Sequence, residues 1–515
     1  MSRALCAALA LVLLVSAPAA SQRGLLPAKR YVLRGEAGLI RVYDSILEGR
    51  FDQVPAELKR ACGPAPPEAC HVLAATALWW RIQLDPDNTI LDEEFSAAVD
   101  RAIASAEEWT AREPDDPEAW FYLGAAYAAR VPWRVLRDEK LSAARDGKRI
   151  KEALERSVGL APTLYDAYFG IGMYRYYADV APAALRFVRF LLLLPGGDRK
   201  EGLQQMLRTR EHGRLLQGEA DYQLHIIYLW YEKQAGRALE LLNGLQKEYP
   251  SNPLFLAQIA EVQDTYQHDI TASLDTWRSL LGMAREQRVN ASAIAEVRAR
   301  LGVARQLEAL QQTDHAIEQL TAVVDLEAAV PYSALALAHL RLGEAYDRIG
   351  RRDDAVASYR RVALTVPDDD RYELVEEAEH KIRSAPDRTK AEAYRLSLQG
   401  WRRLEQKDLP GAAAALDRAL TLQPRDPVAR YRRGRLLQAQ REDEAALVEF
   451  ERAIRDGRHC PAPILAAAHL EAARLHERGG HRDQAVSAYR IAATLFGAAE
   501  ETRAAAKRAI TRLNK

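Results

Sequence analysis

The sequence predicts an all-α fold in which helical hairpins stack into a solenoid that coils as a right-handed superhelix, in one block or two. Three observations lead to this prediction. Matching residues recur at a period of 34 residues in the C-terminal part of the chain. A chain of 515 residues is too long for one compact core but suits an array that grows by stacking. Its composition, 48% apolar and 28% charged, is typical of a soluble folded chain.

The first residues are predicted to be a secretory signal peptide, residues 1–20. Arg3 provides a positive start, Ala4–Val15 is an uninterrupted apolar stretch, and Ala17–Ala19 has the small-x-small pattern of a cleavage site. A retained membrane anchor is the alternative, but the apolar stretch is shorter than the roughly 20 residues that span a bilayer. We therefore expect an exported protein, periplasmic or extracellular, that is soluble after cleavage and has no stable transmembrane span.

Two cysteines are predicted to form a disulfide in such an oxidising compartment. Cys62 and Cys70 flank the proline-rich turn of residues 63–67 between two expected helices. Closing so short a loop stabilises one hairpin by about 2 to 3 kcal/mol. Cys460 has no evident partner and is expected to be a free, inert thiol.

The repeated positions define the hairpins. In the segment from Pro117, four residues follow the order W-x2-L-G-x2-Y. A later segment carries both helices of the unit, with Leu342, Gly343 and Tyr346 followed by Ala355, Tyr359 and Pro367. Gly400 and Gly434 are 34 residues apart, and so are Ala412 and Ala446. The chain is similar in these positions to the tetratricopeptide repeat (TPR) family, a resemblance that implies paired helices and a concave binding face.

The resemblance divides the chain into successive parts. Residues 28–115 are expected to form TPR-like helical hairpins, and residues 116–300 a TPR block. Residues 301–367 are expected to form further hairpins, residues 368–390 an extra helix and linker, and residues 391–515 a C-terminal TPR block. The extra helix, expected over Asp370–Arg383, interrupts the period and could mark a bend between two superhelical blocks.

An apolar helix over residues 182–194 is expected to be inserted in the second part. Pro182 opens it, residues 195–197 close it, and Asp198 with Glu201 predicts the cap of the next helix. Its core, Leu185–Leu194, is too short to cross a membrane, so core packing, docking on a membrane surface and covering the groove stay open. The stretch around it resembles a segment of a eukaryotic TPR family linked to the clearing of lipid inclusion bodies, and no function is carried over from that likeness.

A ligand groove is expected on the first helices of the repeats, by analogy with TPR superhelices. The positions that line the groove there correspond to a mostly aromatic set: Phe121, Tyr122, Phe169, Met173, Tyr176, Ile227 and Trp230. Such a surface suits a helix or an extended peptide with large side chains. The alternative is that these rings pack between helices.

A second site, for an anionic group, is expected in the C-terminal block. The same offsets select Trp401, Tyr431, Arg432 and Arg435, and arginine beside aromatic rings can grip a carboxylate or phosphate. A solvated basic face is the alternative interpretation.

No catalytic motif or metal-ligand spacing is found, so we expect no enzyme activity, no cofactor and no metal. His469, His476 and His481 are interpreted as surface histidines. Lys plus Arg and Asp plus Glu balance at 72 each, which argues against a nucleic-acid partner. The predicted function is a non-enzymatic scaffold or adaptor of the cell envelope that binds a peptide or protein surface. The alternative is a lipid- or membrane-surface-binding repeat protein with peripheral membrane contact.

Overall fold

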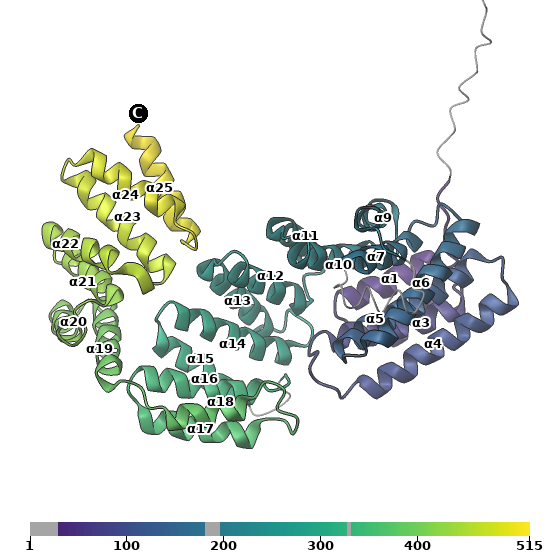
Figure 1. The fold of residues 1–515 in the computed structure, drawn as a ribbon, viewed down its shortest axis with the longest axis horizontal. Coiled ribbons are helices and arrows are strands. Elements are labelled where there is room, and N and C mark those ends of the chain that lie inside the picture. Colours follow the sequence, from purple (N-terminus) through teal and green to yellow (C-terminus); the bar gives the residue numbers. More distant parts are fainter. Residues whose placement is uncertain (1–28, 181–195, 327–330, 515) are drawn as a thin grey trace, which may run out of the picture.

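The computed structural model describes residues 29–180, 196–326 and 331–514. Every regular element in these ranges is a helix, so the all-α prediction is confirmed. The predicted signal peptide and the predicted apolar helix over residues 182–194 lie outside the described residues. In Figure 1 the array is an open curve, with the N-terminal helices clustered at one end and the C-terminal hairpins turning back toward the middle of the chain.

The first helices form a cluster ahead of the regular array. They are α1 (Glu36–Leu47), α2 (Val54–Ala61), α3 (Pro67–Ile82) and α4 (Asp92–Arg112). The hairpins that follow are α5 (Pro117–Leu136) with α6 (Lys140–Leu160), α7 (Ala167–Val180) with α9 (Arg199–His212), α10 (Gln217–Trp230) with α11 (Ala235–Glu248), and α12 (Pro253–Thr265) with α13 (Ile270–Arg285).

The C-terminal half continues with further hairpins. These are α14 (Ser292–Ala309) with α15 (Thr313–Asp325), α16 (Ala334–Arg348) with α17 (Arg352–Thr365), α19 (Arg388–Glu405) with α20 (Leu409–Leu422), α21 (Pro427–Ala439) with α22 (Asp443–Arg455), and α23 (Ala462–Arg478) with α24 (Arg482–Thr494). A short 3₁₀ turn spans Gly457–His459, α18 (Leu374–Arg383) is inserted after α17, and α25 (Glu500–Leu513) ends the array.

Local sequence explains where several helices begin. Asp116, Asn252 and Asp426 each precede a proline at the first helical position, and each side chain accepts a hydrogen bond from a backbone N–H of the first turn. This is the favoured combination, because the cap satisfies a free N–H and proline has none to satisfy. The predicted cap at Asp198 is also observed, since its carboxylate accepts from the N–H of Glu201 at 2.9 Å. The extra helix starts at Leu374 rather than Asp370, and Asp370 accepts from the N–H groups of Leu374 and Val375.

The repeat signature has a packing reason. Gly343 on α16 faces the ring of Tyr359 on α17 so closely that an added Cβ would lie 2.4 Å from a ring carbon. Gly434 and Phe450 repeat this arrangement on α21 and α22, where the added Cβ would lie 2.6 Å from the ring. The small residue therefore lets the two helices approach, and the large one fills the space between them.

The hydrophobic core is divided unevenly. One large cluster of buried side chains runs from Leu33 to Val262 and joins α1 through α12. Beyond it, the C-terminal hairpins bury separate, smaller clusters, such as the one that contains Tyr489 at the end of the array. The N-terminal half is consequently a compact body, while the C-terminal half is a thin solenoid.

Candidate functional site

The predicted aromatic groove is mostly buried in the protein's own core. Five of its seven side chains are buried, with at most 7% of their surface exposed: Phe121, Tyr122, Phe169, Tyr176 and Ile227. Met173 packs half-buried against the same core, and only Trp230 is open to solvent, with 55% of its surface exposed. Buried side chains cannot contact a ligand in this conformation, so the packing alternative describes these five residues.

α1 and α3 pack onto α10 and α12 in the same core cluster. Trp80 on α3 packs against the ring of Tyr222 on α10, at 4.7 Å between centroids, and against Phe255 on α12, at 6.2 Å. Tyr43 on α1 donates to the carboxylate of Glu219 on α10 at 2.9 Å. The sequence predicted a separate stretch of hairpins here, whereas these first helices fold back onto α10 and α12.

Glu219 is a buried carboxylate where α1, α3 and α10 meet. It accepts hydrogen bonds from the Tyr43 hydroxyl, from the indole N–H of Trp80 at 3.0 Å and from the amide of Gln223 at 3.2 Å. All three donors are neutral, and burial raises the pKa of Glu219. Burial also lowers the pKa of nearby His225 to about 4. The cluster joins helices far apart in sequence, and nothing among its contacts provides access for a substrate.

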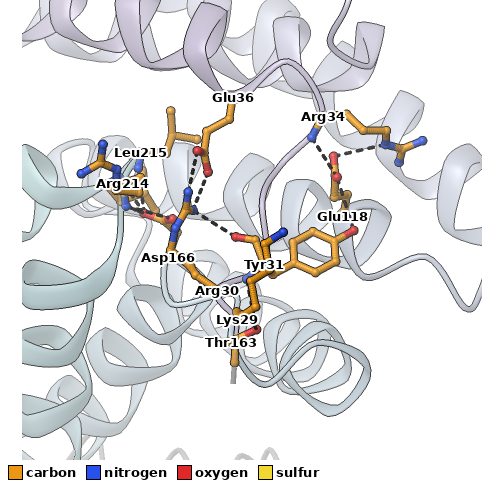
Figure 2. A network of polar contacts seen from close by, with 11 residues as sticks. Lys29, Arg30, Tyr31, Arg34, Glu36, Glu118, Thr163, Asp166, Arg214 and Leu215 are labelled. Carbon is orange, nitrogen blue, oxygen red and sulfur yellow. Dashed lines mark hydrogen bonds and ion pairs between the residues drawn. The ribbon is translucent and has the colours of Figure 1, made fainter. Parts of the chain in front are cut away.

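An extended segment, Lys29–Arg34, crosses this body before α1 begins (Figure 2). Its backbone pairs with the α6–α7 turn, because the N–H of Tyr31 donates to Thr163 and the Thr163 hydroxyl donates to the carbonyl of Lys29. The buried carboxylate of Glu118 accepts from the N–H of Arg34 at 3.0 Å. We call this segment the N-terminal strap. It ties the start of the described chain to α5 and to the α6–α7 turn.

The predicted anionic site is only partly assembled. Trp401 and Tyr431 lie side by side, with ring centroids 6.3 Å apart, and Arg435 donates to the Tyr431 hydroxyl at 3.3 Å. Arg432 does not join them. It is buried, with 4% exposed, and donates to the carbonyl of Gln311 in the α14–α15 turn and to the hydroxyl of Ser397, each at 2.8 Å. Its placement there is a correction, because the guanidinium is used to hold α21 against that turn.

A cleft that the sequence analysis missed lies between α23 and α25. Its volume is about 630 Å³, and it is more open to solvent than enclosed. Leu470, Tyr489, Ala505 and Ala509 provide an apolar floor, and four arginines and one glutamate surround it: Arg474, Arg478, Arg508, Arg512 and Glu477. We call this the arginine cleft. The spacing of four residues within each arginine pair, which places both on one helix face, is the signal that could have revealed it.

The charges of the arginine cleft are unevenly satisfied. Arg512 pairs with Glu477 at 2.6 Å, and Arg474 pairs with Glu471 at 2.6 Å. Arg478 pairs with Asp443 at 3.0 Å, whereas Arg508 forms no ion pair with any residue that the structure describes. Hydrogen bonds from Tyr489 and then Arg512 lower the pKa of Glu477, and burial raises the pKa of Tyr489 to about 12. The cleft therefore keeps an excess of positive charge beside an apolar floor.

The remaining predictions concern histidines, metals and membranes. His469 is buried, with 9% of its surface exposed, and burial lowers its pKa, so its interpretation as a surface histidine was wrong. His476 is half-buried, and His481 is exposed. Among the described residues, no three His, Cys, Asp or Glu side chains are grouped to hold a metal ion. None of the described helices combines the length and the apolar character needed to span a membrane.

These helical hairpins define a repeat solenoid, and comparison with known proteins identifies the repeat. Two tetratricopeptide-repeat family models match the chain, one over residues 337–369 and one over residues 397–459. The first of these segments covers most of α16 and all of α17, and the second covers α20, α21, α22 and part of α19. The prediction that the chain is a tetratricopeptide-repeat protein is confirmed in these segments. No curated protein matches the sequence.

Solved structures that are similar to the chain include three proteins. A tetratricopeptide repeat protein from Parabacteroides merdae is 13% identical, with a TM-score of 0.26, over 58% of this chain and 99% of that one. The TPR2AB domain of yeast Sti1 in its pHSP90 complex is 15% identical, with a TM-score of 0.20, over 58% and 96%. A Rap protein complexed with Competence and Sporulation Factor is 13% identical, with a TM-score of 0.34, over 93% and 99%. Scores this low support no inference about function.

Proposed function

We propose that this protein is a non-catalytic scaffold that binds an acidic segment of a partner protein in the arginine cleft between α23 and α25. The observation that carries the proposal is the excess of arginine over an apolar floor. Tetratricopeptide arrays bind their partners on the surface formed by equivalent helices of successive units. α25 lies next to α23 with α24 between them in the chain, where the first helix of a following unit would lie.

The chemistry of the cleft favours carboxylates on an extended chain. Guanidinium groups bind carboxylates through paired, charge-assisted hydrogen bonds. Arg508 can donate to a ligand without first breaking an ion pair among the described residues. Arg512 and Arg474 would exchange their present carboxylate partners, Glu477 and Glu471, for those of the ligand. The apolar floor of Leu470, Ala505 and Ala509 would accommodate a hydrophobic side chain between acidic ones. We therefore expect a segment in which Asp or Glu alternates with an apolar residue.

Export and a role in the cell envelope remain part of the proposal. They rest on the predicted signal peptide alone. The lipid-binding alternative has lost its main support, because most side chains of the aromatic groove on which it depended are buried in the core. Its second support, the apolar helix over residues 182–194, lies outside the described residues.

The test is the binding of a labelled acidic peptide to residues 21–515, measured by fluorescence anisotropy. We expect an alternating Glu–Leu peptide to bind and a Lys–Leu peptide of the same length not to bind. Arg508→Ala should weaken binding about fivefold, the equivalent of about 1 kcal/mol for one exposed charged contact. Affinity should fall with added salt, because the contacts are ionic.

A matched control is available on the same half of the protein. Arg425 is exposed in the α20–α21 turn, outside the arginine cleft, so Arg425→Ala removes the same charge and should leave affinity unchanged. Equal losses in the two variants would mean that only the overall charge attracts the peptide. Absence of binding to the acidic peptide would refute the proposed site.

A further inference from the structure

Two turns that are far apart in the sequence meet at the end of the array. The α12–α13 turn provides His268 and Asp269, and the α24–α25 region provides Phe496 and Arg503. The rings of His268 and Phe496 meet edge to face with centroids 5.2 Å apart. Arg503 pairs with Asp269 at 3.3 Å across 234 residues of sequence. Figure 1 shows the same approach, with the start of α25 beside α12 and α13.

This contact closes the C-terminal half on itself. From α13 the array runs through α14 to α18, turns through α19 to α22, and returns with α23 to α25. A second contact lies deeper, where buried Arg432 on α21 holds the α14–α15 turn. The helices between these two contacts, α21 to α25, are thus held at one end by a buried tie and at the other by a surface contact.

Part of this contact is exposed and part is buried. Phe496 remains 68% exposed although its ring touches His268, whereas Asp269 is only 8% exposed. Arg503 has a second carboxylate within reach, Glu500 on its own helix at 2.9 Å, and therefore keeps a partner when Asp269 is released. Asp269 in turn caps α13 through the N–H of Ala272 at 3.0 Å, which holds it in position whether or not Arg503 is bound. Opening therefore leaves Arg503 its ion pair with Glu500 and leaves Asp269 the hydrogen bond of the helix cap.

We propose that His268, Asp269, Phe496 and Arg503 form a latch that opens and closes the C-terminal half and so changes the shape of the arginine cleft that the partner binds. This inference rests on the proposed function. α25 carries Arg503 in the latch and Arg508 and Arg512 in the cleft, so the same helix moves both. The acidic partner brings carboxylates that compete with Asp269 for Arg503. When Arg503 contacts the partner only after its release from Asp269, binding of the partner shifts the population toward the open form.

The test measures the distance across the latch. Thr265 and Glu501 are exposed on its two sides, and both are changed to cysteine in a Cys460→Ser background and spin-labelled. The double variant Phe496→Ala, Arg503→Ala should shift the distribution of distances between the two spin labels to longer values. Saturating Glu–Leu peptide should produce the same shift in the protein whose latch residues are unchanged. Arg490→Ala, an exposed arginine of α24 outside the latch, should leave the distribution unchanged. Thermal melts establish that each variant is folded.

The outcomes separate the two proposals. An unchanged distance distribution in the paired variant overturns the latch, even when anisotropy shows that the peptide binds. If the distances lengthen in the paired variant but the protein binds no acidic peptide, the contact is movable. In that case the proposed binding of a partner in the arginine cleft is overturned. A peptide that binds and leaves the distance unchanged overturns the coupling between cleft and latch.

Discussion

At the scale of single residues, the structure shows how polar groups are used to join helices that are distant in the sequence. Glu219 gathers donors from α1, α3 and its own helix. Arg432 joins α21 to the α14–α15 turn and to α19, and Glu118 receives the N-terminal strap. Each is largely removed from water. Hydrogen bonds of this kind fix one arrangement of the helices, since a displaced helix would leave buried polar groups unpaired.

Glu219 gives a prediction about pH. Folding raises the pKa of this carboxyl through burial, so the folded chain binds the proton more tightly than the unfolded chain. Stability should then fall as pH rises through the pKa of an unfolded glutamate, about 4.3, and toward the raised value in the folded chain. Glutamine does not ionise, so Glu219→Gln removes this loss. The free energy of unfolding of the variant, measured with urea, should therefore rise relative to that of the parent between pH 4 and pH 8. Equal pH dependence in the two proteins would contradict the assignment.

Glu219→Ala provides the complementary case. It leaves the Tyr43 hydroxyl and the Trp80 indole N–H without an acceptor, which should cost about 2 kcal/mol or more. The two variants should therefore differ in sign at pH 8, the glutamine stabilising and the alanine destabilising.

Gly343 gives a second prediction at this scale. An alanine there would place its Cβ 2.4 Å from the Tyr359 ring, so Gly343→Ala should destabilise the protein by about 1 to 3 kcal/mol through overpacking. Gly244 lies inside α11 with no atom near the added Cβ, and Gly244→Ala should instead stabilise by about 0.5 to 1 kcal/mol. Chemical unfolding of both variants tests the pair. Destabilisation of similar size in both would mean that helix propensity, not packing against Tyr359, decides the result.

At the scale of helices, the sequence predicted what depends on neighbouring residues and missed what depends on distant ones. The hairpins from α16 to α24 follow the repeat signature because Gly343 and Tyr359, or Gly434 and Phe450, meet within one unit. The placement of α1 and α3 over α10 and α12 depends on contacts across more than a hundred residues, such as Trp80 with Tyr222. No periodicity reports such contacts. The offsets that selected the aromatic groove likewise could not report that Tyr122 packs on Trp109 and Tyr176 on Tyr231.

The same distinction explains the site. Trp401 and Tyr431 were expected together because they occupy matching positions of successive units, and they lie together. The arginine cleft needed α25 to be placed beside α23, and α25 lacks the repeat signature. The spacing of its arginines can be seen in the sequence, but the helix against which α25 packs cannot be predicted from it.

The disulfide between Cys62 and Cys70 gives a prediction at the scale of one hairpin. It joins the end of α2 to α3 across eight residues, with the Cα atoms 6.1 Å apart. Replacing both cysteines by serine should lower stability by about 2 to 3 kcal/mol and destabilise α1 to α4 first. Hydrogen exchange followed by mass spectrometry would show where protection is lost.

Cys460→Ser is the control for the disulfide. This thiol is unpaired, and burial raises its pKa to about 12, so it is expected to be unreactive. The substitution should leave protection in α1 to α4 unchanged. Equal losses from both changes would mean that the thiols themselves, rather than the cross-link, stabilise the chain.

At the scale of the whole molecule, the division of the core predicts unequal stability. The N-terminal half shares one cluster of buried side chains from Leu33 to Val262, whereas each C-terminal hairpin depends on its neighbours. Stability in such an array is a sum of local terms and nearest-neighbour contacts. The N-terminal half should therefore unfold as one unit and the C-terminal half progressively.

Removal of α25 tests this division. Deleting residues 500–515 uncovers the buried face of α24 around Tyr489 and removes Arg503 from the latch. We expect hydrogen exchange to become faster in α23 and α24, and to remain unchanged in α1 to α12. Faster exchange throughout the chain would contradict the independence of the two halves.

The closure of the C-terminal half also constrains how this protein can evolve. Open solenoids lengthen or shorten by gaining or losing whole repeats, because each unit contacts only the next. Here the turn that contains Asp269 must meet α25 after 234 residues, so one added or deleted hairpin between them would displace Arg503 and Phe496 from their partners. Duplications should accordingly be tolerated outside this interval and selected against within it, which would make the number of hairpins between α13 and α24 the most invariant length among its descendants.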